Sequence, residues 1–146
     1  MPVNPYIAAM CCATQDVNPL FNLIGARLVS AANGKAVIEM PISPCLTQGE
    51  GAIAGGILAT LADEAMAHAV ISLLEHGKHT VTTEMNIRFL RSADPDKGGL
   101  LIATATVIKA GRNILTTEAV IHDGTGRLLV TAGGSFFVVD GKKSGQ

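Results

Sequence analysis

The chain has 146 residues, which one hydrophobic core of ordinary size accounts for, so we expect a single domain over residues 1–146. Hydrophobic residues make up 48% and charged residues 16%, which excludes a disordered chain. The net charge is −1 with no basic stripe, which argues against nucleic acid as the main partner. Small apolar residues and 16 glycines favour a helix packed closely on a sheet.

Three features favour a cytoplasmic protein that does not span a membrane. The apolar patch Tyr6–Ala13 lacks the preceding Lys or Arg of a secretory signal. The longest apolar run, Ala52–Leu74, is interrupted by Asp63, Glu64 and His68, which makes a membrane-spanning helix costly. The cysteines are odd in number and lack zinc-site spacing, so we expect free thiols in a reducing cytosol and no metal site.

The first elements carry local start and stop signals. Residues 16–25 are predicted to form a short helix, because Asn-Pro stands at its start and glycine at its end. The dipeptide Asn33-Gly34, between apolar residues of the segment 26–40, predicts a β-hairpin. Two prolines and two glycines predict a loop over residues 41–51.

One long helix is predicted from Ala54 or Gly55 to about Glu75, and its apolar residues cover nearly the whole circumference, so it should be buried on most sides. Four strands follow, and their short connections predict an antiparallel meander. They are expected over 80–90, 100–109, 114–122 and 128–139. After Asp140 we expect a frayed tail. The predicted class is therefore α+β, with about six antiparallel strands wrapped around one long central helix.

Asp63 stands in the middle of the long apolar helix. A buried carboxylate is costly unless it is paired or hydrogen-bonded, so Asp63 is a candidate functional group. The alternative is that the carboxylate lies on a narrow solvated stripe of the helix. Glu64 and His68, spaced i and i+4, are expected to form such a stripe.

Gly55 and Gly56 stand where this helix begins. Their N–H groups lack partners inside the helix and are suited to polarise a carbonyl, although the glycines could simply let the loop turn. Gly55 and Asp63 are roughly 12 Å apart along one helix. A reacting carbon must lie about 3–3.5 Å from its attacking atom, so joint action requires two antiparallel helices from two subunits. The spacing therefore predicts a two-fold dimer with two sites.

The helix start Ala54-Gly55-Gly56-Ile57-Leu58-Ala59-Thr60-Leu61-Ala62-Asp63 and the strand Thr82-Thr83-Glu84-Met85-Asn86-Ile87-Arg88-Phe89-Leu90 resemble the hot-dog thioesterases of the phenylacetate-degradation (PaaI-like) type. The similarity covers roughly residues 29–139. It implies the hot-dog fold, assembly into homodimers or homotetramers, and hydrolysis of a small acyl-CoA to free acid and CoA.

By this resemblance, the Gly55 N–H polarises the thioester carbonyl, and Asp63 attacks it or acts as general base for water. Thr82 helps to position the water, unless it is an ordinary strand threonine. Two positions depart from the family pattern: Ala54 replaces the motif histidine, and Gln48 stands where Asn is usual. These departures imply altered substrate choice, a reduced rate or lost catalysis.

The phosphates of coenzyme A call for cations near the mouth of the site. The turn after residue 109 resembles the family segment that lines the pantetheine channel. The candidate substrate-binding residues are Ala54, Gly56, Arg88, Arg91, Lys109, Gly111, Arg112 and Asn113. Each cation alone is also compatible with a solvated surface charge. No ATP, flavin or nicotinamide signature occurs, so we expect no cofactor beyond the coenzyme A of the substrate.

Two other functions remain open. A non-catalytic protein that binds acyl-CoA or another small ligand is compatible with Ala54 and Gln48. A hot-dog hydratase or dehydratase lacks support, because it needs a catalytic histidine and none begins this helix.

Overall fold

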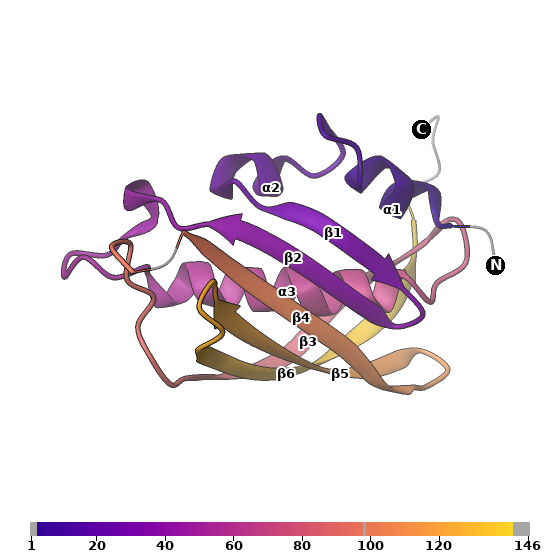
Figure 1. Cartoon of the computed structure of the whole chain (residues 1–146). Helices are drawn as coiled ribbons and strands as arrows, with labels where there is room; N and C mark the ends of the chain where they lie inside the picture. The colour runs from indigo at the N-terminus through magenta and orange to yellow at the C-terminus, as the bar shows by residue number, and fades with distance from the viewer. Residues whose placement is uncertain (1–2, 98, 142–146) are drawn as a thin grey trace.

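A six-stranded antiparallel sheet wraps around the helix α3 (Gly55–Ile71) in the computed structural model, which describes residues 3–97 and 99–141 (Figure 1). This arrangement confirms the predicted α+β class. The strands are β1 (Arg27–Ala32), β2 (Lys35–Pro41), β3 (Lys78–Phe89), β4 (Leu100–Ala110), β5 (Ile114–Asp123) and β6 (Leu128–Asp140). The other helical elements are α1 (Pro5–Met10), α2 (Pro19–Ile24) and the 3-10 helix η1 (Pro44–Leu46).

Both N-terminal helices begin with an asparagine cap followed by proline. Asn18 caps α2, as predicted, by accepting a hydrogen bond from the Phe21 N–H at 3.4 Å. Helix α1 is absent from the sequence-based prediction, although it begins in the same way. There Asn4 precedes a proline and accepts from the Tyr6 N–H at 2.9 Å. The hairpin prediction is also confirmed, because Asn33 and Gly34 have φ angles of 53° and 78°, as a two-residue turn between strands requires.

The strand order is β1-β2-β4-β5-β6-β3, so the prediction of a meander through all four C-terminal strands is wrong for β3. β3 pairs with β6 instead, over its full length. The reason is the connection of residues 90–99, which does not turn back on β3. It is held by bonds from the Leu90 N–H to the Leu129 carbonyl and from the Ile53 N–H to the Ala93 carbonyl. β3 is therefore an edge strand.

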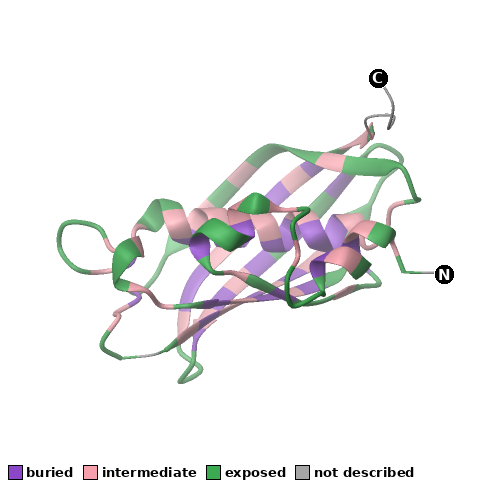
Figure 2. Cartoon of the chain, turned by 90° about the horizontal axis from the view of Figure 1, so that it is seen from above, coloured by how far each residue is buried: buried purple, intermediate pink, exposed green. Residues whose placement is uncertain are grey.

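Helix α3 packs closely on the sheet, as the small residues predict. A Cβ added to Gly134 of β6 would lie 3.4 Å from Met66 Cε of α3 and 3.1 Å from the Glu84 carbonyl oxygen. Glycine at this position therefore lets the helix and β3 both approach β6. Figure 2 shows that the buried residues concentrate along α3 and the strands facing it. The helix residues without exposed surface are Leu61, Ala62, Ala65, Met66, Ala69 and Val70.

His68 is 1% exposed, so the prediction of a solvated Glu64–His68 stripe is wrong. Two aromatic rings from the N-terminal helices cover it: the Tyr6 ring stacks on the imidazole at 5.5 Å between centroids, and the Phe21 ring lies at 5.2 Å. Helical spacing alone gives no sign of this cover, because it comes from a segment far away in sequence.

At the C-terminus, Gly141 donates to the Gly77 carbonyl at 2.7 Å, so the expected frayed tail does not begin directly after Asp140. The remainder of that tail, residues 142–146, lies outside the described residues. Cys11, Cys12 and Cys45 are exposed free thiols. In the described ranges, each helix is too short or too polar to pass through a lipid bilayer.

The free energy of unfolding should fall by up to about 3 kcal/mol as the pH drops from 6.5 to 4. Burial lowers the pKa of His68 from 6.5 to about 4. The unfolded chain therefore binds a proton more readily in this window, and stability present above it is lost as the pH falls. Urea unfolding of the wild type and His68→Gln should show this slope only in the wild type.

His76→Gln, at an exposed histidine, is the matched control and should keep the wild-type slope. Burial raises the pKa of Glu64, so its protonation favours the folded state as the pH falls, and the His68 contribution is the difference between variant and wild type. An identical slope in His68→Gln and wild type would contradict the assignment.

Candidate active site

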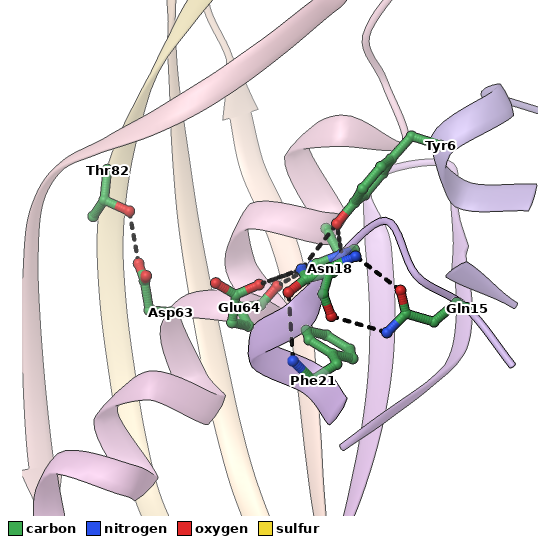
Figure 3. A network of polar contacts seen from close by, with 8 residues as sticks. Tyr6, Gln15, Asn18, Phe21, Asp63, Glu64 and Thr82 are labelled. Carbon is green, nitrogen blue, oxygen red and sulfur yellow. Dashed lines mark hydrogen bonds and ion pairs between the residues drawn. The ribbon is translucent and has the colours of Figure 1, made fainter. Parts of the chain in front are cut away.

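Asp63 lies midway along α3, half-buried, with its carboxylate directed at β3 (Figure 3). The Thr82 hydroxyl donates to Asp63 Oδ1 at 2.7 Å. Among the described residues nothing donates to the second oxygen, Oδ2. The hydroxyl therefore fixes the orientation of the carboxylate and leaves one oxygen for a ligand or water. The structure brings these two predicted site residues together.

The start of α3 presents open backbone N–H groups. The Ala54 carbonyl accepts from the Ile57 and Leu58 N–H groups, whereas Gly55 and Gly56, one and two positions after this N-cap, are exposed. An added Cβ would meet nothing at Gly56 and only the Phe89 ring, at 3.5 Å, at Gly55. Packing alone does not require glycine at either position. The positive end of the helix dipole is thus accessible to a polar group that approaches closely.

A cleft of about 300 Å³ opens beside this helix start, and it gathers further predicted residues. Gln48 and Arg91 line it together with Gly55 and Phe89. The Arg91 Nη1 donates to the Leu128 carbonyl at 2.8 Å, which anchors the guanidinium at the cleft wall. The Gln48 side-chain oxygen accepts from the Glu50 N–H within its own loop. The NH₂ group of the Gln48 amide and one lone pair of its oxygen are therefore left for a ligand.

The predicted residues of the β4–β5 turn lie at the other end of α3. A hollow of about 450 Å³ beyond the helix C-terminus is lined by Gly111, Arg112 and Asn113 together with Lys78. Gly111 is required there, because an added Cβ would lie 2.6 Å from the Ile114 carbonyl oxygen. Lys109 is exposed near the end of β4. Within one chain these groups are not brought together with the helix start.

Arg88 lies on the sheet face that points away from α3. It lines an outer hollow of about 410 Å³ together with Asn86 and Glu118. A β-bulge between Thr82 and Glu84 explains this placement, because one extra residue changes which side chains face the helix. Thr82 faces α3 before the bulge, whereas the even-numbered residues after it face outward.

A polar cluster next to Asp63 is missing from the sequence-based site. Asn18 and Tyr6 reach Glu64 and His68 on α3 (Figure 3). Burial raises the pKa of Glu64, and the nearby charge of Asp63 adds to this effect, while the hydrogen bond from Asn18 opposes it. The Asn-Pro signal identifies Asn18 as a helix cap, but it gives no indication of this second role.

Residues 50–130 match the family model of the thioesterase superfamily. The chain belongs to this superfamily. Among curated relatives, human acyl-coenzyme A thioesterase 13 is 34% identical over 103 residues, which cover 70% of this chain and 71% of the human protein. The resemblance to hot-dog thioesterases is therefore confirmed.

Two solved structures show the same hot-dog fold. The PaaI protein from the phenylacetic acid degradation operon of E. coli has a TM-score of 0.78 at 26% identity, over 86% of this chain and 88% of PaaI. A Bacillus halodurans protein, whose structure was determined with CoA, has a TM-score of 0.74 at 28% identity, over 85% of this chain and 78% of that protein.

Gly55→Pro should fold and lower kcat/KM for thioester hydrolysis by roughly 10²–10³-fold, the effect of losing one oxyanion donor. Proline is tolerated at the first helical position, and Ala54 already has φ −60° and ψ 136°, which suit a residue before proline. The substitution therefore deletes one N–H group without breaking α3. Kinetics with a thiol-detecting assay measure the effect.

Gly55→Ala is the matched control, because it adds a Cβ and retains the N–H group. Its loss of kcat/KM should be much smaller than that of the proline variant. Equal activities of both variants and the wild type would exclude the Gly55 amide from the reaction.

Proposed function

We propose that this protein hydrolyses a small acyl-CoA thioester, with an aryl or a short to medium acyl group, to the free acid and CoA. The observation that carries the proposal is the Asp63 carboxylate, held midway along α3 by the Thr82 hydroxyl at 2.7 Å. Membership in the thioesterase superfamily supports the reaction class. The name of the human relative and the CoA in the Bacillus halodurans structure support the substrate class.

Asp63 acts through its free oxygen, by one of two routes. As general base, it takes a proton from water while the water oxygen attacks the thioester carbon. As nucleophile, it attacks the carbon itself, and water then hydrolyses the resulting anhydride. In both routes the Gly55 N–H donates to the carbonyl oxygen as negative charge develops there. The carbon–sulfur bond breaks, and CoA leaves as a thiolate that takes up the proton lost by the attacking water, before this step in the first route and after it in the second.

The site is shared between two copies of the chain. Gly55 and Asp63 are roughly 12 Å apart along α3, too far for one thioester to contact both. Thr82 contacts Asp63 and Phe89 lies beside Gly55, so β3 runs antiparallel to α3. Two β3 strands that pair antiparallel about a two-fold axis carry the partner's helix start towards Asp63.

β3 has the properties of a strand that pairs with another chain. It is 12 residues long, and its second edge pairs with no other strand of the described residues. Val81 and Phe89 on it are 46% and 52% exposed. A long, exposed and partly apolar edge is a template for pairing. The same pairing sets the hollow beside Arg112 and Lys78 next to the cleft of the partner. The predicted residues of the β4–β5 turn and of the helix start then lie together, whereas Arg88 stays apart on the outer face.

A second candidate is non-catalytic binding of acyl-CoA. The bond from the Glu50 N–H to the Gln48 side-chain oxygen favours it, because it ties the amide to its own loop. Ala54 also supplies no polar side chain at the helix start. Saturable binding of several acyl-CoA thioesters without turnover by the wild type would support this candidate.

Asp63→Asn should lower kcat for the preferred acyl-CoA by roughly 10²–10⁴-fold while the protein stays folded, because the amide neither attacks nor accepts a proton efficiently. Thr82→Val should lower it by about 2–10-fold, the cost of one hydrogen bond, and Thr82→Ser should retain most of it. Turnover of an acyl-CoA panel, followed through the released thiol, measures these effects. Asp16→Asn, at an exposed aspartate, is the control, and a wild-type rate in Asp63→Asn would exclude the mechanism.

Mixing inactive variants tests the shared site. After Asp63→Asn and Gly55→Pro chains are unfolded, mixed in equal amounts and refolded, about half of the dimers should be mixed, each with one intact site of two. About a quarter of the wild-type activity should therefore return, whereas neither variant recovers when it is refolded alone. No recovery, although mixed dimers form, would mean that both groups act within one chain.

A further inference from the structure

The N-terminal segment reaches α3 immediately beside Asp63. Asn18 Nδ2 donates to the Tyr6 hydroxyl oxygen at 3.0 Å and approaches Glu64 Oε2 at 3.4 Å (Figure 3). The Tyr6 hydroxyl in turn bonds His68 Nε2 at 3.0 Å, and His68 Nδ1 lies 2.7 Å from the Glu64 carbonyl oxygen. Two residues of the N-terminal segment therefore hold two residues of α3, and one of these is the sequence neighbour of Asp63.

The direction of each bond follows from its partners. A carbonyl oxygen only accepts, so His68 Nδ1 carries the proton and donates to the Glu64 carbonyl. Nε2 of the neutral ring then accepts, so the Tyr6 hydroxyl donates to it. The Tyr6 oxygen accepts from the side-chain NH₂ group of Asn18. The backbone N–H of Asn18 donates in turn to the Gln15 side-chain oxygen at 2.8 Å. One arrangement of protons satisfies the whole set, which makes the contact between the segment and α3 directional.

Apolar packing also restrains α3, because Leu61 and Met66 on either side of Asp63 are fully buried. The neighbouring buried residues Ala62, Ala65 and Ala69 have short side chains, so this packing alone leaves room for a small rotation of the helix. Asp63 and Glu64 project about 100° apart on the helix. Holding Glu64 from the N-terminal segment therefore also sets the direction in which Asp63 points.

We propose that Asn18 and Tyr6 are positioning residues for the reaction: through Glu64 and His68 they fix the rotation of α3 that aims Asp63 at Thr82. This inference rests on the proposed function of Asp63. A misplacement of about 1 Å at a reacting group can cost roughly 10²-fold in rate. The segment before β1 therefore contributes to catalysis without contacting the substrate.

Asn18→Ser tests this role, because serine keeps a cap oxygen for α2 and removes the NH₂ group that reaches Tyr6 and Glu64. We expect kcat to fall roughly 10–100-fold, with KM within about twofold of the wild type. Asn4→Ser is the matched control, since Asn4 also caps a helix before a proline, and within the described residues its side chain bonds the Tyr6 N–H alone, without contact to α3. Equal kcat in both variants would overturn the proposal.

A pair of substitutions at Glu64 separates position from charge. Glu64→Gln keeps an oxygen for Asn18 and should retain most of the wild-type kcat, whereas Glu64→Ala should lose as much as Asn18→Ser. If Glu64→Gln and Glu64→Ala lose the same share of kcat, the charge of Glu64 matters rather than its contact with Asn18, and the positioning role is wrong.

A crystal structure of Asn18→Ser gives a readout that does not depend on activity. The distance from Thr82 Oγ1 to Asp63 Oδ1 should exceed 3.5 Å, against 2.7 Å in the wild type. An unchanged distance overturns the positioning role even if no thioester is turned over. Full activity of Asp63→Asn instead overturns the proposed function, so the two failures are distinguishable.

Discussion

A carboxylate in the middle of a buried helix is the constraint on which the arrangement of this protein depends. Such a group needs a hydrogen-bond donor, because an unpaired charge in an apolar environment is costly. Thr82 supplies that donor from β3, and β3 lies at the edge of the sheet. Asp63 is therefore satisfied on one side by its own chain and lies beside the strand edge at which a second copy can add.

The side of α3 that carries Glu64 and His68 is covered by the chain's own N-terminal helices. There the chain itself closes the structure, with α1 and α2 covering polar residues that the sheet does not reach. The neutral imidazole bonds a hydroxyl and a carbonyl, so its burial leaves no polar atom without a partner. One helix thus has an open side at Asp63 and a sealed side at His68.

Local signals in the sequence were sufficient for much of this fold. The Asn33-Gly34 turn, the capped helix α2 and the long apolar helix α3 each depend on neighbouring residues, and each is confirmed. The position of β3 beside β6 and the burial of His68 depend on contacts between distant segments. Strand pairing across the connection 90–99 and aromatic cover from Tyr6 leave no periodic pattern near the residues that they affect, so neither was predicted.

The candidate site depends on both kinds of signal. A carboxylate in an apolar helix singles out Asp63, and the unpaired N–H groups of the helix start single out Gly55, whereas the resemblance adds Thr82 and Gln48. The bond from the Glu50 N–H to Gln48 depends on the loop conformation, which the sequence did not show. Likewise, counting alternate residues along β3 places Thr82 and Arg88 on one face, and the bulge at Thr83 separates them.

That bulge decides which changes of length β3 tolerates. Thr82 lies opposite Phe136 and Glu84 opposite Ser135, so deleting Thr83 would leave a regular strand in which each later side chain keeps its face. Deleting Met85 instead would turn Asn86 and Arg88 towards the core and expel Ile87, which now packs against it. The strand can therefore lose its bulge residue, whereas the number of residues from Glu84 to the Phe89 ring cannot change by one without exchanging the two faces of the strand.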